Sequence, residues 1–221
     1  AYSEKPNPEK TAETAERVLA RIPERERENV SKMIDRKINS PLTSSAGRLF
    51  DAVSSILGLR DRATYEGEAA VELEAAALAV SSDALAEKSY GYNVSEAAPS
   101  VNDATQPSVI DVAPMIRAII EEHEAGIDRA WISRRFHHSI AAIITDTALR
   151  LSKETGITDV VLSGGVFQNR LLCRMAKERL TGAGLTPWFN STVPTNDGGI
   201  SLGQLVAAAE QFSKQTKEGG S

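Results

Sequence analysis

Two glycine pairs in the last third of the chain are the residues best suited to hold a ligand. The first pair, Gly164 and Gly165, ends the apolar run in VVLSGGVFQN (residues 160–169), and Asn169 follows where it can cap the next helix. Paired glycines let a ligand approach the backbone closely, and the start of a helix presents free N–H groups to an anion. The same pattern is also typical of a tight strand-to-helix turn that binds nothing. Spacing alone leaves both interpretations open.

The second pair, Gly198 and Gly199, lies in TNDGGIS (residues 195–201), again directly before a helix. Asp197 stands beside it. A carboxylate in this place can cap the helix through neighbouring N–H groups, or it can bind a hard cation near phosphate groups. Two such strand–glycine–helix corners on adjacent strands of one α/β sheet would share one edge of that sheet. The sequence therefore predicts a common pocket at the two corners.

Further carboxylates stand in two helical motifs of the first half of the chain. Asp51 lies in GRLFDAV, and Glu72 follows the turn at Gly67 in YEGEAAVELE. An acidic side chain can accept the hydroxyl groups of a ribose. Any surface helix offers such a carboxylate, so the spacing alone is also consistent with a purely structural role.

Other reactive side chains favour structural interpretations. His137 shares a helical stripe with apolar residues, which favours a buried, hydrogen-bonded histidine over a metal ligand. His138 is its neighbour in sequence and points about 100° away on a helix, a poor arrangement for one ion. Cys173 is predicted to be a buried structural thiol. We expect no Ser–His–Asp or Cys–His catalytic triad.

Hydrophobic periodicity places these residues on a series of helices and short strands. The helices are expected at residues 11–21, 24–37, 46–57, 69–80, 113–124, 129–154, 170–180 and 200–212, and the strands at 90–94, 108–112, 158–163 and 187–190. The first two strands could pair as a hairpin with a long connection. The strand at 158–163 has the pattern of a buried strand, and the strand–helix–strand–helix order that it begins predicts parallel pairing.

Helix faces give the expected core. In the helix at 129–154 the predicted buried side comprises Ile132, Phe136, Ile140, Ile143, Ile144 and Leu151. Core packing is also expected for the Ala-rich stretches 69–80 and 203–209, although both could instead pack on a partner.

Composition limits the class of protein. The chain has 221 residues, with 41% apolar and 25% charged residues, which is typical of a globular protein. Its net charge of −5 has the wrong sign for a general nucleic-acid binder. A single cysteine excludes an internal disulfide, and no apolar run approaches the ~20 residues that a membrane span needs. We therefore expect a soluble, cytoplasmic protein with no membrane or nucleic-acid partner.

Five ordered motifs together resemble a known family. NSPLTSSAGRLFDAVSSILGL, YEGEAAVELEAAA, RRFHHSIAAII, VVLSGGVFQNRLL and NDGGISLGQ are similar to the C-terminal part of HypF, the [NiFe]-hydrogenase maturation carbamoyltransferase. The resemblance implies a helix-rich α/β fold, a Kae1-like lobe of the actin/hexokinase/Hsp70 ATPase superfold. It would place the transfer domain at residues 39–212, after a charged helical lead-in (1–38) and before a flexible tail (213–221).

The resemblance also implies an activity and partners. In this family a YrdC-like domain makes carbamoyl-adenylate from carbamoyl phosphate and ATP, and the Kae1-like domain passes the carbamoyl group to the C-terminal cysteine of HypE. That group becomes the cyanide ligand of the hydrogenase. The expected partners are HypE and the rest of a HypF chain, with its YrdC-like and acylphosphatase-like domains. The alternatives are a threonylcarbamoyl-transfer relative that modifies tRNA and a nucleotide-binding module that is inactive in isolation.

Matching positions carry the family's site residues onto this sequence. The AMP part of carbamoyl-adenylate would be held by Asp51, Gly67, Glu72, Gly164, Gly165 and Asn169. Asp197 is similar to the carboxylate that helps bind a divalent metal, with Mg, Fe and Zn all left open. The family's His-x-x-x-His motif is not in this sequence, so we expect no complete metal site and no independent turnover. No side chain is assigned as the catalytic residue, since HypE would supply the nucleophile.

Overall fold

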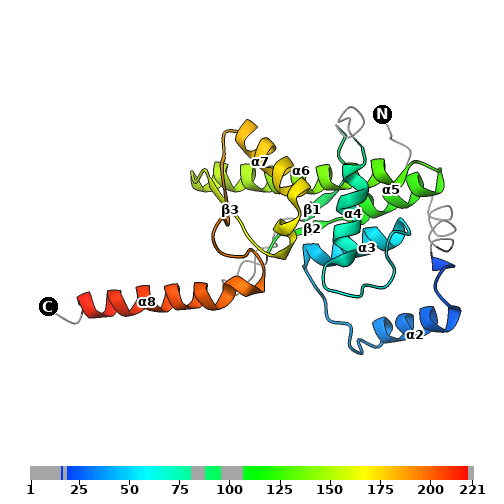
Figure 1. Cartoon of the computed structure of the whole chain (residues 1–221), viewed down its shortest axis with the longest axis horizontal. Coiled ribbons are helices and arrows are strands. Elements are labelled where there is room, and N and C mark those ends of the chain that lie inside the picture. Colours follow the sequence, from blue (N-terminus) through cyan, green and yellow to red (C-terminus); the bar gives the residue numbers. More distant parts are fainter. Residues whose placement is uncertain (1–15, 17–18, 81–87, 96–106, 219–221) are drawn as a thin grey trace. The chain divides into compact units, whose positions relative to one another are not determined.

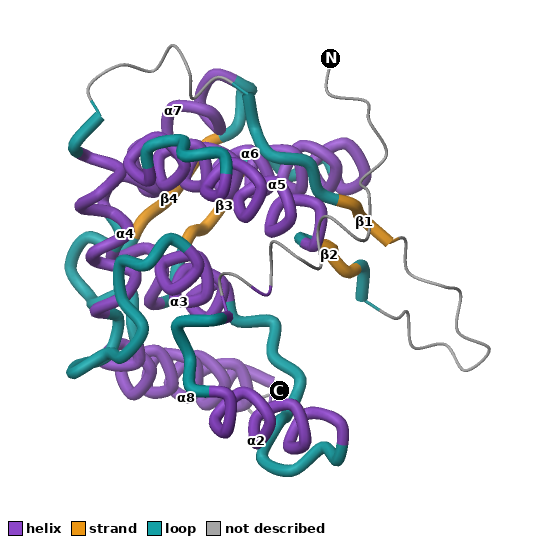
Figure 2. Tube along the Cα trace, turned by 90° about the vertical axis from the view of Figure 1, so that its right-hand side faces the viewer, coloured by secondary structure: helices purple, strands orange, loops and turns teal. Residues whose placement is uncertain are grey.

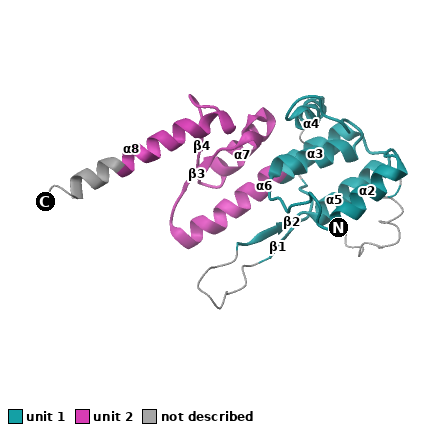
Figure 3. Cartoon of the chain, turned by 90° about the horizontal axis from the view of Figure 1, so that it is seen from below, with its two compact units in different colours: residues 1–139 teal, residues 140–221 magenta. Residues whose placement is uncertain are grey.

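The computed structural model describes residue 16 and residues 19–80, 88–95 and 107–218, with side chains placed up to residue 211. The chain forms two compact units, Ala1–Ser139 and Ile140–Ser221 (Figure 3). Most of the helix expected at residues 11–21 lies outside the described residues.

Unit 1 is built mainly from helices. Its elements are α2 (Glu24–Asp35), α3 (Ala46–Ile56), α4 (Glu68–Leu78), β1 (Asn93–Ser95), β2 (Val109–Asp111), α5 (Ala113–Glu124) and the first part of α6 (Arg129–Thr155). Helix α3 packs against both α4 and α5 (Figure 1). The helices match the expected ranges to within about two residues at each end, whereas β1 begins at Asn93, later than the strand expected at 90–94.

Apolar side chains at helical spacing form the core of unit 1. The rings of Phe50 and Phe136 meet edge to face with centroids 4.8 Å apart. Leu73, Met115 and Ile132, from three helices, are fully buried. The burial predicted for Ile132 and Phe136 is thus confirmed.

Local sequence signals set the helix ends of unit 1. Pro23 directly precedes α2, and Gly58 follows α3 with a left-handed φ of 66°. Ser45 occupies the N-cap position of α3, but its side chain makes no capping hydrogen bond. Gly67 precedes α4 with φ 82°, so the tight turn expected there is confirmed.

Strands β1 and β2 pair in antiparallel register, with Val94 opposite Ile110 (Figure 2). The predicted hairpin pairing is therefore confirmed. Most of its connection, residues 96–106, lies outside the described residues.

Unit 2 contains the expected α/β arrangement. After the end of α6 come β3 (Asp159–Leu162), the 3-10 turn η1 (Gly165–Gln168), α7 (Arg170–Gly182), β4 (Thr186–Phe189), the 3-10 turn η2 (Asp197–Gly199) and α8 (Ile200–Glu218). Strands β3 and β4 are parallel, and their last residues, Leu162 and Phe189, lie opposite each other (Figure 2). The helix-rich α/β class and the parallel pairing are confirmed.

Several burial predictions for unit 2 were wrong. Val161 of β3 is 73% exposed, because β3 and β4 form only a two-stranded sheet within the described residues and α7 packs on β4. Leu151 is 46% exposed, since the end of α6 is largely open to solvent. The Ala-rich stretch at residues 203–209 of α8 is mostly exposed rather than part of a core. Helix α8 also continues to Glu218, past the end expected at Phe212.

Candidate functional site: two glycine corners and a helix pair

The two glycine pairs of unit 2 lie at the same edge of the β3–β4 sheet. Because the strands are parallel, their carboxyl ends share one edge, and each is followed by a glycine-containing turn. The backbone N–H of Gly164 donates to the carbonyl oxygen of Thr195 at 2.9 Å. This hydrogen bond joins the first corner (residues 164–169) directly to the second corner (residues 195–199). The predicted juxtaposition of the two corners is therefore confirmed.

The two glycines of the first corner have different reasons to be glycine. Gly164 has φ 105° and ψ 160°, a backbone conformation that is essentially restricted to glycine. Gly165 has no such φ, and a Cβ atom built on it would meet no heavy atom within 4 Å. A Cβ atom would meet no heavy atom within 4 Å at either position, so only the backbone conformation of Gly164 requires a glycine.

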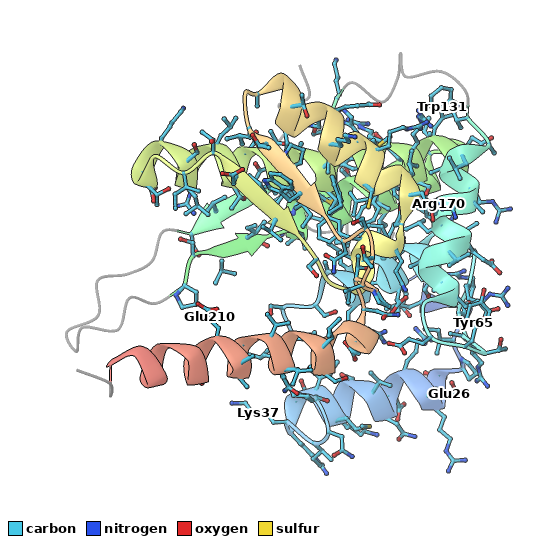
Figure 4. All side chains as sticks on the ribbon, turned by 60° about the vertical axis from the view of Figure 1, so that its left-hand side comes forward. Glu26, Lys37, Tyr65, Trp131, Arg170 and Glu210 are labelled. Atoms are coloured by element: carbon cyan, nitrogen blue, oxygen red, sulfur yellow. The ribbon has the colours of Figure 1, made fainter. Side chains whose placement is uncertain are left out.

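Asn169 ends the first corner and begins α7. Its Oδ1 accepts a hydrogen bond from the N–H of Leu172 at 2.8 Å, and only 8% of the residue is exposed. The predicted N-cap is thus confirmed. Arg170, the first residue of α7, is exposed and labelled in Figure 4. Cys173, which was expected to be buried, is only partly buried and donates its thiol hydrogen to the carbonyl of Phe167 at 3.1 Å.

In the second corner the capping residue is Asn196 and not Asp197. The Oδ1 atom of Asn196 accepts from the N–H of Gly198 at 3.1 Å, while Asp197 is exposed at the first position of η2. A Cβ atom on Gly199 would lie 2.6 Å from the carbonyl oxygen of Pro194, so this glycine permits a close backbone approach. Sequence reasoning missed Asn196, although asparagine is among the strongest N-cap residues. Because Asn196 caps the turn, the Asp197 carboxylate takes no part in this capping hydrogen bond.

In unit 1, the other predicted positions lie on the packed pair α3 and α4. Asp51 on α3 is partly exposed, and its Oδ2 lies 2.9 Å from a guanidinium nitrogen of Arg48. Glu72 on α4 is ion-paired with Arg60 and is also partly exposed. Both carboxylates therefore carry a local cationic partner and keep some contact with solvent.

The start of α4 and the loop before it hold two functional candidates that sequence reasoning missed, Glu68 and Arg60. Glu68, the first residue of α4, is 7% exposed and accepts hydrogen bonds from the backbone N–H of Thr64 at 2.5 Å and from its hydroxyl at 3.1 Å. These bonds, with help from the nearby Arg60 guanidinium, lower the pKa of the Glu68 carboxyl. Tyr65 marks this turn in Figure 4. The Thr64–Glu68 spacing was visible in the sequence, but the long reach of Arg60 to α4 was not.

The described residues do not form a metal cage. No group of three or more His, Cys, Asp or Glu side chains in the described part of the chain is arranged to hold an ion. An exposed carboxylate such as Asp197 is by itself a poor site for a transition metal. The same ranges contain no helix that is long and apolar enough to cross a membrane.

Parallel strands that end in joined glycine corners, each followed by a helix, are typical of nucleotide-binding α/β proteins. The family comparison is more specific. A family model described as the carbamoyltransferase, Kae1-like domain, second subdomain, matches residues 3–204. The chain therefore belongs to the HypF carbamoyltransferase family, and the Kae1-like fold expected from the motifs is confirmed.

Curated relatives and a solved structure agree with this membership. The chain is 34% identical over 168 residues to carbamoyltransferase HypF of Synechocystis sp., covering 76% of this chain and 20% of that protein. It is 36% identical over 182 residues to HypF of Rhizobium leguminosarum bv. viciae, covering 82% and 22%. A crystal structure of full-length HypF in the phosphate- and nucleotide-bound form is similar with a TM-score of 0.80 and 38% identity, covering 91% of this chain and 25% of that one. The chain thus spans about a fifth to a quarter of the length of these relatives.

Proposed function

We propose that this chain is the part of a HypF carbamoyltransferase that holds carbamoyl-adenylate by its AMP portion and directs the carbamoyl group toward the C-terminal cysteine of HypE. The observation that carries the proposal is the Gly164–Thr195 hydrogen bond, which joins two glycine corners at one sheet edge. A relative of the same fold is described as phosphate- and nucleotide-bound, which supports a nucleotide as the ligand. The proposal assigns the first corner to the adenosine of the ligand and Asp197 of the second corner to a divalent metal.

The first corner supplies a close backbone approach for the adenosine. The open space at Gly165 leaves room for a ligand against the main chain, and Asn169 fixes the start of α7 beside it. In unit 1, Asp51 and Glu72 are the carboxylates that we propose to accept the ribose hydroxyl groups, with Gly67 setting the start of α4. These roles need polar and backbone atoms but no nucleophile from this chain.

The proposed transfer is a substitution at the carbamoyl carbon. The thiolate of HypE forms a new C–S bond, the bond between the carbamoyl carbon and the AMP phosphate oxygen breaks, and AMP leaves with the electron pair. Holding the two reactants in alignment can account for about 7–11 kcal/mol of a barrier. Positioning is therefore the main contribution expected from this chain.

Asp197 is proposed as one carboxylate toward a divalent metal. The described residues do not supply the other ligands that such an ion needs, so we expect the purified chain alone to carry no stoichiometric metal. Stoichiometric iron or zinc in the purified chain, measured by elemental analysis, would contradict the expectation that this chain lacks a complete metal site.

The remainder of a HypF chain is the proposed partner of unit 2. Helix α8 exposes Ile200, Leu202, Leu205 and Val206, and between residues 200 and 211 its only charged residue is Glu210 (Figure 4). An apolar surface of this kind is typical of an interaction site. The curated relatives are four to five times longer than their matched segments, so the remaining HypF domains are the natural cover for this helix.

Calorimetric titration tests the nucleotide site. The chain would be titrated with AMP, ATP and a non-hydrolysable carbamoyl-adenylate analogue, alone and in a fusion that supplies the remaining domains of a HypF relative. We expect binding that is lost in Asp51→Ala, with Asp146→Ala, an exposed carboxylate on α6, as the matched control. A folded fusion that binds none of the three ligands would refute the proposal.

A further inference from the structure

We infer that Arg60 is a positioning residue, which fixes the Glu72 carboxylate in the orientation that receives the ribose. This inference rests on the proposed function, because it assigns a role toward the same nucleotide. It concerns a group in the loop before α4 that no sequence motif singled out.

The anchor of the arrangement is the buried carboxylate of Glu68. One of its oxygens, Oε2, accepts both hydrogen bonds from Thr64, and the other, Oε1, lies 3.3 Å from the Arg60 guanidinium. Loss of these partners from a buried carboxylate would be strongly destabilising. Glu68 therefore holds both the loop and the guanidinium in place.

Arg60 bridges two carboxylates on one face of α4. Glu68 and Glu72 are four residues apart, so they lie one above the other on the helix and would repel each other without a cation between them. The same guanidinium nitrogen of Arg60 contacts Oε1 of both residues. The hydrogen bond to Glu72 and the two negative charges raise the pKa of Arg60.

The magnitudes favour orientation over stability as the role of the Arg60–Glu72 pair. Each of these two side chains is 34% exposed, and ion pairs with this much solvent contact contribute little to folding. The buried end of the bridge, at Glu68, is only 9% exposed at its side chain and cannot move freely. The bridge therefore restricts the Glu72 rotamer while the partly exposed Glu72 remains reachable by a ligand.

The test compares the ribose preference of variants. AMP and 2′,3′-dideoxy-AMP would be titrated against the fusion protein and its Arg60→Ala, Arg60→Lys and Glu72→Gln variants. We expect Arg60→Ala to reduce the preference for AMP about as much as Glu72→Gln does, roughly tenfold, because each loses an oriented charged hydrogen bond. The double variant should show no further loss, and Arg60→Lys should recover part of the preference.

Arg62→Ala is the matched control. Arg62 lies two residues away in the same loop, is 84% exposed at its side chain and pairs with Glu26 at 3.4 Å. We expect this variant to keep the ribose preference unchanged. A change in thermal stability alone, with the preference kept in Arg60→Ala, would overturn the positioning role.

The two proposals fail in different ways. If the wild-type fusion does not bind AMP, the proposed function fails and this inference falls with it. If AMP binds and Glu72→Gln lowers the ribose preference while Arg60→Ala does not, only the positioning role of Arg60 is wrong.

Discussion

Replacing the two glycines of the first corner by alanine separates the needs of the fold from the needs of a ligand. Gly164 has φ 105° and ψ 160°, which a residue with a Cβ atom adopts only under strain of about 1–3 kcal/mol. Gly165 has an ordinary φ, and a methyl group at its Cα would meet no heavy atom within 4 Å. We therefore expect Gly164→Ala to lower the free energy of unfolding by about 1–3 kcal/mol.

Gly165→Ala should behave differently. Its stability should stay within about 1 kcal/mol of the wild type and could rise slightly, because alanine reduces the conformational entropy of the unfolded chain. Nucleotide binding should nevertheless weaken by at least about tenfold, equivalent to ~1.4 kcal/mol, since the added methyl group fills the space through which the ligand approaches the backbone.

Urea unfolding followed by circular dichroism measures the first quantity, and calorimetric titration with AMP measures the second. A Gly165→Ala protein that is stable and binds AMP as tightly as the wild type would refute the assignment of Gly165 to the ligand. Equal stability of Gly164→Ala and Gly165→Ala would refute the conformational argument for Gly164.

Three further predictions concern packing and polar contacts. His137 is fully buried, and burial lowers its pKa to about 4. As the pH falls from 6.5, the unfolded state therefore binds a proton before the folded state does, and the free energy of unfolding should drop by about 3 kcal/mol between pH 6.5 and 4. Urea unfolding at several pH values should show this slope for the wild type and not for His137→Leu. Asn169→Ala should cost about 1 kcal/mol by removing the α7 cap, and Asn169→Ser should restore most of it in the same assay. The Glu122 carboxylate accepts a hydrogen bond from the Tyr90 hydroxyl at 2.5 Å and pairs with Arg135. Glu122→Gln weakens both contacts, so the thermal midpoint should fall by several degrees, corresponding to about 1 kcal/mol or more. An unchanged midpoint would show that this network adds nothing to stability.

Helix positions were predictable because their signals are local. Ile132 and Phe136 are four residues apart on α6 and both are buried, and a helix with one apolar stripe must bury that stripe against a neighbour. Turn residues are equally local, since the positive φ of Gly58 and Gly67 is a property of the residue itself. Both kinds of signal act within a few residues and need no knowledge of the rest of the fold.

Burial on the sheet and on α8 could not be predicted in the same way. The continuous apolar run of β3 is typical of a strand covered on both faces, but it does not say which elements supply the cover, and in the described two-stranded sheet Val161 is exposed. The Ala-rich part of α8 likewise indicates a helix without indicating what packs on it. Burial depends on which other elements pack on a strand or helix, and local sequence does not identify those elements. The burial predictions for β3 and α8 were therefore wrong although both elements form.

The candidate site shows the same division between local and long-range signals. The capping role of Asn169 depends on a neighbour three residues away, and its type and position predicted it. The contact between Arg60 and Glu72 spans 12 residues and depends on how the loop folds back onto α4. A charged pair of this kind has no periodic signature, so only the structure could reveal it.

The link between the glycine corners has a consequence for the proposed ligand site. The Gly164–Thr195 bond is formed by backbone atoms alone, so the spacing of the two corners does not depend on any side chain at these positions. Asn196 then fixes η2 immediately after Thr195, and Asp197 is the next residue along that turn. The direction of the Asp197 backbone is therefore tied to the first corner through two consecutive hydrogen-bonded residues. If a ligand contacts the main chain at Gly165, as we propose, the second turn is already held to the same corner, and such a fixed backbone is what a positioning site requires.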